Sequence, residues 1–81
     1  MSRFEDHARN AQRLEEQIRA ARHHVELNRR LIEHYKQLYE KHRAEERDTK
    51  PVKDLLDTLE RTQQVFEYDL AELERRRDAL N

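Results

Sequence analysis

Apolar and half-apolar residues recur on a seven-residue repeat along the first half of the chain, from Phe4 to His42. A repeat of this period places its residues along one side of a helix, and neither Gly nor Pro interrupts it. The pattern therefore predicts one helix of roughly 40 residues, over about residues 3–46. Position a of the repeat holds Phe4, Ala11, Ile18, Val25, Ile32 and Tyr39, and position d holds His7, Leu14, Ala21, Asn28, Tyr35 and His42.

The repeat stops near Arg47 and resumes after the single proline, Pro51. Proline disfavours a helical conformation at the residue before it and suits the first turn of a new helix. We therefore expect a turn over about residues 47–51 and a second helix over about 52–80. Its position d holds Val52, Leu59, Phe66, Leu73 and Leu80, and its position a holds Leu56, Gln63, Leu70 and Arg77.

Two long helices joined by a short break predict an antiparallel coiled-coil hairpin, and the charges beside the seam support this orientation. In an antiparallel pair, the e positions of the two helices face one another. The first helix carries bases at e and the second carries mostly acids, and folding at the break matches them. The expected e pairs are Arg22 with Glu74, Arg29 with Glu67, and Lys36 with Glu60; on the g side, His24 is expected beside Asp69. Such exposed pairs are individually weak, so they select the orientation and register rather than stabilise the fold.

Aligning the helices by these pairs gives a set of expected seam layers. Ile18 then lies opposite Leu80, Val25 opposite Leu73, Ile32 opposite Phe66, Tyr39 opposite Leu59, and His42 opposite Leu56. Asn28 meets Leu70 and Gln63 meets Tyr35, so both amides interrupt an apolar seam. Polar seam residues often fix register or oligomeric state, and we expect this role for both.

In this register, two apolar regions have no partner within the chain. Residues 1 to about 17 overhang the second helix, and a flank near the turn widens the apolar stripe. Isolated helix pairs of this size are marginal, so another helical surface should cover both regions. The simplest choice is a second copy of the chain, which makes a four-helix bundle. The expected partner or dimer interface comprises Phe4, Ala8, Ala11, Leu14, Leu31, Tyr35, Leu38, Tyr39 and Leu55.

Composition narrows the functions further. There is no Gly to build a phosphate-binding loop and no Cys for a disulfide or thiolate metal site. With 17 basic and 18 acidic residues the formal net charge is -1, which gives no overall attraction to nucleic acid. No apolar run approaches 18 residues, so we expect no membrane span and a cytoplasmic location. We expect no catalytic site, no cofactor and no metal site, because the hydroxyls of Ser2 and Thr49 suit helix caps and the histidines form no matched ligand cluster.

Three alternatives stay open from the sequence. One is a single continuous helix that pairs in parallel as a rod, which would place Pro51 in a helix interior. Arg outnumbers Lys by 13 to 4, and arginine suits phosphate as well as carboxylate, so a dimeric hairpin could bind structured RNA or DNA through Arg-rich faces. Protonation of His7, His24 or His42 could also make an interface sensitive to pH. The pattern favours the interpretation that the protein is a non-enzymatic coiled-coil adaptor, regulator or chaperone-like module. Such a module would self-associate and present a helical face to another protein.

Overall fold

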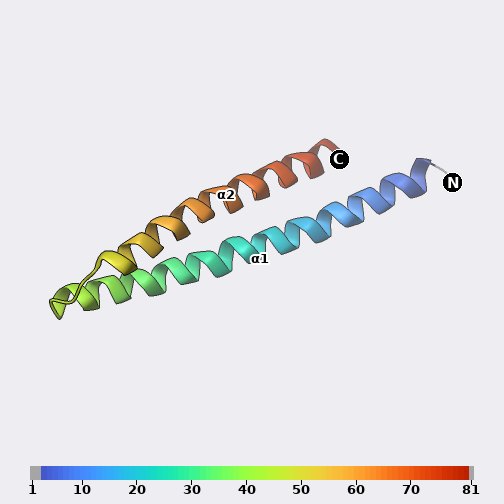
Figure 1. Ribbon diagram of the computed structural model, residues 1–81. Helices are drawn as coiled ribbons and strands as arrows, with labels where there is room; N and C mark the ends of the chain where they lie inside the picture. The colour runs from blue at the N-terminus through green and yellow to red at the C-terminus, as the bar shows by residue number, and fades with distance from the viewer. Residues whose placement is uncertain (1–2, 81) are drawn as a thin grey trace.

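The chain folds into two long helices that lie side by side and run in opposite directions (Figure 1). This computed structural model describes residues 3–80, apart from the side chain of Phe4. Helix α1 spans Arg3–Ala44 and helix α2 spans Lys50–Leu80. The all-α hairpin that the sequence predicts is confirmed, and it measures 66 × 17 × 14 Å.

The turn between the helices begins earlier than the sequence suggested. Helix α1 ends at Ala44, not at 46, with a Schellman motif. The backbone N–H of Arg47 donates to the carbonyl of His42 over 2.8 Å, and that of Glu46 donates to Arg43 over 3.2 Å. This motif needs a left-handed residue after the helix, and Glu46 takes that role with φ of 57°. The chain has no glycine, so a glutamate occupies a position that glycine usually fills.

Helix α2 also begins earlier than expected, at Lys50 rather than Val52. Thr49 supplies the first accepting carbonyl, which receives the N–H of Lys53 over 2.9 Å. A carboxylate oxygen of Asp48 accepts the N–H of Lys50 over 3.0 Å, which satisfies one of the free donors at the helix start. Pro51 follows within the first turn, where it has no N–H to leave unpaired.

The buried core is a narrow line of side chains along the seam. Among the described residues, the buried hydrophobic side chains are Leu14, Ile18, Val25, Ile32, Val52 and Leu56. Ile32, Val52 and Leu56 form one cluster near the turn, against which Tyr35, Leu38, Tyr39 and Leu59 pack. So small a core leaves the single hairpin marginally stable.

The register of the two helices differs from the expected one by a heptad. Asn28, expected opposite Leu70, hydrogen-bonds instead to Gln63, which lies one heptad closer to the turn. Phe66, expected opposite Ile32, lies against the ring of His24 with centroids 5.5 Å apart. The expected seam layers are therefore wrong.

Side-chain direction explains the error. Every Cα–Cβ bond in a helix leans toward its own N-terminus, so long side chains on antiparallel helices converge from backbone positions that are not level. Arg29 still reaches Glu67 over 3.3 Å, and the expected pairing of charges survives. An alignment that places these charged residues level with one another therefore displaces the shorter seam side chains by one heptad.

The corrected register also shortens the overhang. Leu14 is only 8% exposed and Ile18 only 1%, so α1 is covered well before residue 17. Arg77 of α2 reaches Glu15, with Nε and Oε1 3.9 Å apart. The expectation that Leu14 belongs to an unpartnered surface is wrong, because α2 extends one heptad further along α1 than we assumed.

Candidate interaction surface

The two sides of the hairpin differ sharply in charge. On the e side, Arg22 lies 3.7 Å from Glu74 and Arg29 lies 3.3 Å from Glu67. The structure thus brings together two of the three expected e pairs; within residues 3–80, no ion pair joins Lys36 to Glu60. All of these groups are substantially exposed to solvent, so each pair contributes little to stability and chiefly excludes other alignments.

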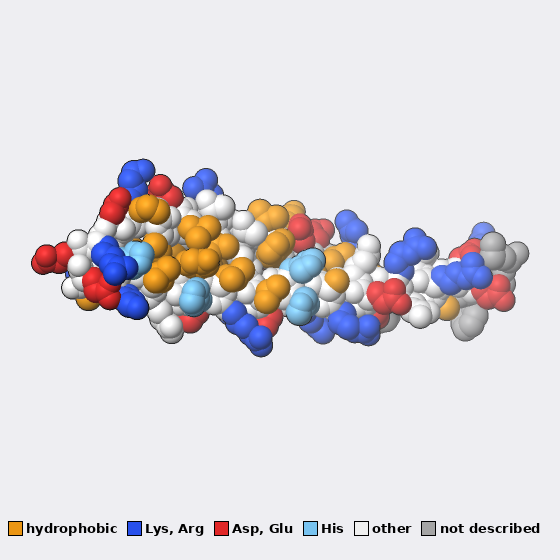
Figure 2. Space-filling view, turned by 60° about the horizontal axis from the view of Figure 1, so that its bottom comes forward, with side chains coloured by type: hydrophobic (Ala, Val, Ile, Leu, Met, Phe, Trp, Pro, Cys, Tyr) orange, Lys and Arg blue, Asp and Glu red, His pale blue; other side chains and the backbone are white. Residues whose placement is uncertain are grey.

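On the opposite side, a run of uncharged residues extends along both helices, and we call this run the uncharged face; Asp69, Glu72 and Arg76 of α2 lie beside it. On α1 most of its residues recur at spacings of three, four or seven positions, which keeps them on one side of the helix. The face comprises Ala20, Ala21, His24, Leu27, Leu31 and Leu38 of α1 with Leu55, Thr62, Phe66 and Leu73 of α2. Figure 2 shows this side, where hydrophobic side chains gather over the half of the molecule nearer the turn and histidines lie among them.

Several large hydrophobic side chains of this face remain open to solvent. Leu27 is 48% exposed, Leu31 is 42% exposed and Leu55 is 39% exposed. The interface expected from the sequence includes Leu31 and Leu55 but not Leu27. Leu27 lies outside the seam positions a and d and the flanking positions e and g. The spacing of Ala20, His24, Leu27 and Leu31 is itself a helical stripe, and that signal could have identified it.

The other expected interface residues have different environments. Tyr35, Leu38 and Tyr39 are half-buried because they already pack against the core cluster of the same chain. Ala8 is exposed and Ala11 is half-buried near the N-terminal end of α1. The side chain of Phe4 is not among those that the structure describes. Ser2, and the helix cap expected there, also lie outside the described residues.

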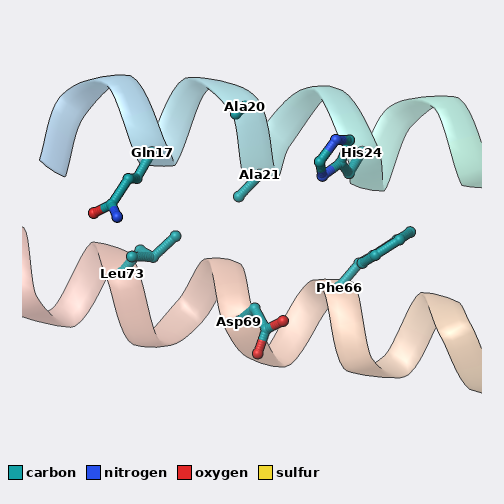
Figure 3. Close-up of a pocket in the computed structure, with 7 residues that line it drawn as sticks. All are labelled: Gln17, Ala20, Ala21, His24, Phe66, Asp69 and Leu73. Atoms are coloured by element: carbon teal, nitrogen blue, oxygen red, sulfur yellow. The ribbon is translucent and has the colours of Figure 1, made fainter. Parts of the chain in front are cut away.

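Two adjoining hollows lie along the uncharged face, and a third, of about 240 Å³, lies beside Leu38 with His34, Gln37 and Lys41. The larger has a volume of about 280 Å³ and is lined by Gln17, Ala20, Ala21, His24, Phe66, Asp69 and Leu73. Figure 3 shows why it is open: the short side chain of Ala21 points toward α2 and leaves space there, while Phe66 and Leu73 bound the hollow from α2. A second hollow of about 160 Å³ adjoins it beside Leu27 and Leu31, and the two share His24 and Phe66.

His24 and Asp69, expected as a g pair, both line the larger hollow. The imidazole of His24 packs on the ring of Phe66 at an interplanar angle of 33°. Its surroundings are therefore mainly aromatic and apolar. Among the residues that line the two adjoining hollows, Asp69 is the one carboxylate.

A chain of amide hydrogen bonds crosses the seam behind this face. The side-chain N–H₂ of Asn28 donates to Gln63 Oε1 over 2.8 Å and to the carbonyl of Leu59 over 3.0 Å. Gln63 Nε2 in turn donates to the carbonyl of Val25 and to Glu67. Asn28 is 5% exposed and Gln63 is 9% exposed. Both buried amides are thus satisfied within one chain and need no second copy for that purpose.

His42 occupies a less favourable position at the turn end of the seam. Its Nδ1 is buried and has no hydrogen-bond partner among the residues that the structure describes. A buried nitrogen without a partner costs free energy relative to its hydrated state. His42 therefore lowers the stability of the hairpin near the turn.

Other kinds of site were sought over the described part of the chain. Residues 3–80 contain no group of three or more His, Cys, Asp or Glu side chains placed to hold a metal ion. Neither α1 nor α2 contains a stretch apolar enough to cross a membrane. What the described residues do offer is a long, weakly charged surface with exposed leucines and a hollow.

Comparison of the chain with models of known protein families, with curated protein sequences and with solved structures finds no match.

Proposed function

We propose that the protein is a non-enzymatic coiled-coil interaction module that self-associates through its uncharged face into a four-helix bundle and presents its remaining helical faces to another protein. The observation that supports this most directly is the contrast between the two sides of the hairpin. One side is lined with paired charges, and the other exposes Leu27, Leu31 and Leu55 with few charges around them. Contiguous apolar surface of this kind marks sites of protein association.

Burial energetics favour covering this face. Fully burying a leucine side chain contributes roughly 1.5–3 kcal/mol, and each exposed leucine of the face has about half of that still to gain. Within the described hairpin, six hydrophobic side chains are buried and the others that pack at the seam are only partly buried. A contribution of a few kcal/mol from association is therefore comparable with the whole stability of so small a domain.

A second surface, on α2 beside the uncharged face, also offers apolar area to a protein partner. Val65 is 57% exposed and Tyr68 is 64% exposed on α2. Tyr68 also lines an open depression with Glu72 and Arg76, and this depression shares Asp69 and Leu73 with the larger hollow. An aromatic ring between opposite charges is a common feature of protein-binding surfaces, because it offers apolar area and polar orientation together.

The Arg-rich alternative has weaker support. Arg29 and Arg30 lie within 3.3–3.7 Å of carboxylates, from Glu26 or Glu67. Phosphate binding would have to displace those carboxylates or accept their repulsion. Nucleic-acid binding therefore remains the second proposal, and its salt dependence distinguishes it from the first.

The direct test measures solution mass against concentration for three chains. Light scattering of the wild type should give about twice the 10.0 kDa of one chain. Leu31→Glu places a charge on the uncharged face and should give the single-chain mass. Gln64→Glu adds the same charge at an exposed position outside that face and should remain dimeric. Circular dichroism should show that all three chains are helical. A wild type that stays monomeric at every concentration would refute self-association.

A further inference from the structure

Resting on the proposed self-association, we propose that His24 makes the dimer sensitive to pH, so that the two copies separate as the pH falls from about 7.5 to about 5.5. The two adjoining hollows of the uncharged face meet at this residue, which lines both of them. The other two histidines considered from the sequence lie elsewhere. His7 is exposed near the N-terminal end of α1, and His42 is half-buried at the seam beside the turn.

Any docking that covers the exposed leucines of the uncharged face also covers His24. Leu27 follows His24 by three residues and Leu31 follows it by seven, so the three side chains lie on one side of α1 within about 11 Å along its axis. A specific interface covers about 800 Å² on each copy, which is about 28 Å across. A contact centred on the two leucines therefore extends past His24, whether the two turns lie at the same end or at opposite ends.

In the single hairpin, water reaches the imidazole of His24 in either protonation state. The residue is exposed, although its ring packs on that of Phe66 with centroids 5.5 Å apart. An imidazole in water takes up a proton within the range of about pH 5 to 8. Docking replaces the water around the ring by apolar side chains of the second copy. A charged ring loses far more hydration free energy in such a site than a neutral ring does.

The described residues around His24 supply no anion that would compensate for this loss. On α1, the adjacent titratable group is His23, whose ring centroid lies 6.4 Å away and which becomes positive over the same pH range. On α2, Asp69 lines the same hollow, but within residues 3–80 no ion pair joins it to His24. In Figure 3 the carboxylate of Asp69 points away from α1. Docking therefore buries a protonated His24 without a counter-charge, which is unfavourable.

Proton linkage gives the direction and the size of the effect. Separate chains bind a proton at His24 that the dimer excludes, so lowering the pH favours the separate chains. The dimer contains His24 twice, and full exclusion of both protons would raise Kd by up to about a hundredfold for each pH unit below about 6.5. Water that remains at the interface reduces this limit, so we expect a rise of at least about tenfold between pH 7.5 and 5.5.

The test measures Kd against pH for three chains by analytical ultracentrifugation. The wild type should show the rise of at least about tenfold. His24→Gln is neutral at every pH, and its Kd should change by less than about threefold over the same range. His23→Gln removes the same titrating charge at an exposed position outside the uncharged face, so it should keep the pH dependence of the wild type. Circular dichroism at each pH restricts the comparison to helical chains.

Each contrary result has a separate meaning. A wild-type dimer whose Kd does not change with pH would overturn this inference and leave the self-association standing. An affinity that rises on acidification would do the same, because Asp69 would then supply an anion to His24. Equal pH dependence in His24→Gln and in the wild type would assign the effect to another group and also overturn the inference. A wild type that is monomeric at every concentration at pH 7.5 would overturn both this inference and the self-association.

Discussion

The buried pair Asn28 and Gln63 offers the sharpest test of how the hairpin is held in register. Replacing Asn28 by Leu removes the side-chain N–H₂ group that donates to Gln63 Oε1 over 2.8 Å and to the Leu59 carbonyl over 3.0 Å. Both acceptors then stay buried without that donor, because the leucine occupies its place. Leaving a buried polar group unsatisfied costs about 1–3 kcal/mol, so we expect Asn28→Leu to destabilise the hairpin by about 2 kcal/mol.

The matching single variant, Gln63→Leu, should also destabilise, since Asn28 loses its side-chain partner and the Val25 carbonyl loses a donor. The double variant, which carries leucine at both positions, leaves neither amide behind and completes an apolar seam. Replacing both partners of a buried polar pair by apolar groups is nearly neutral or stabilising. A double-mutant cycle should therefore show a coupling of about 2 kcal/mol or more between the two positions.

The assay is urea unfolding and thermal unfolding, both followed by circular dichroism, with all four chains at one concentration because association contributes to stability. Each single variant should melt about 8–16 °C below the wild type, and the double variant near or above it. Single variants as stable as the wild type, with effects that simply add, would show that the amide pair does not determine the register as we argue.

Three further predictions address the turn, the seam end and the charged faces. Glu46→Gly should stabilise the hairpin by about 0.5–1 kcal/mol in urea unfolding, because glycine takes φ near 57° without a Cβ penalty, whereas Glu33→Gly within α1 should destabilise by about 1 kcal/mol. His42→Leu should raise the melting temperature, because it removes a buried nitrogen without a partner; an unchanged or lower value would contradict that account. Affinity for a protein partner should change little between 50 and 200 mM salt, whereas phosphate contacts to RNA or DNA would weaken binding by orders of magnitude over that range.

The local organisation of this protein could be predicted from its sequence because local forces determine it. The heptad repeat and the absence of glycine specify long helices, and Pro51 places the start of the second one to within two residues. The charges at e positions specify an antiparallel pairing, and Arg22 with Glu74 and Arg29 with Glu67 lie together in the structure. These features depend on residue spacing along one helix, or on the sign of a charge, and neither requires knowledge of packing.

The register of the two helices, that is, which residues of α1 lie opposite which residues of α2, was decided by the tertiary structure. Long side chains lean along the helix axis, so paired charges do not mark level backbone positions, and a shift of one heptad preserves the same apolar pattern. Packing and the hydrogen bonds of Asn28 with Gln63 select among such registers. That selection buries Leu14, shortens the overhang and leaves the uncharged face with its hollow, because which side chains remain exposed depends on what stands opposite them.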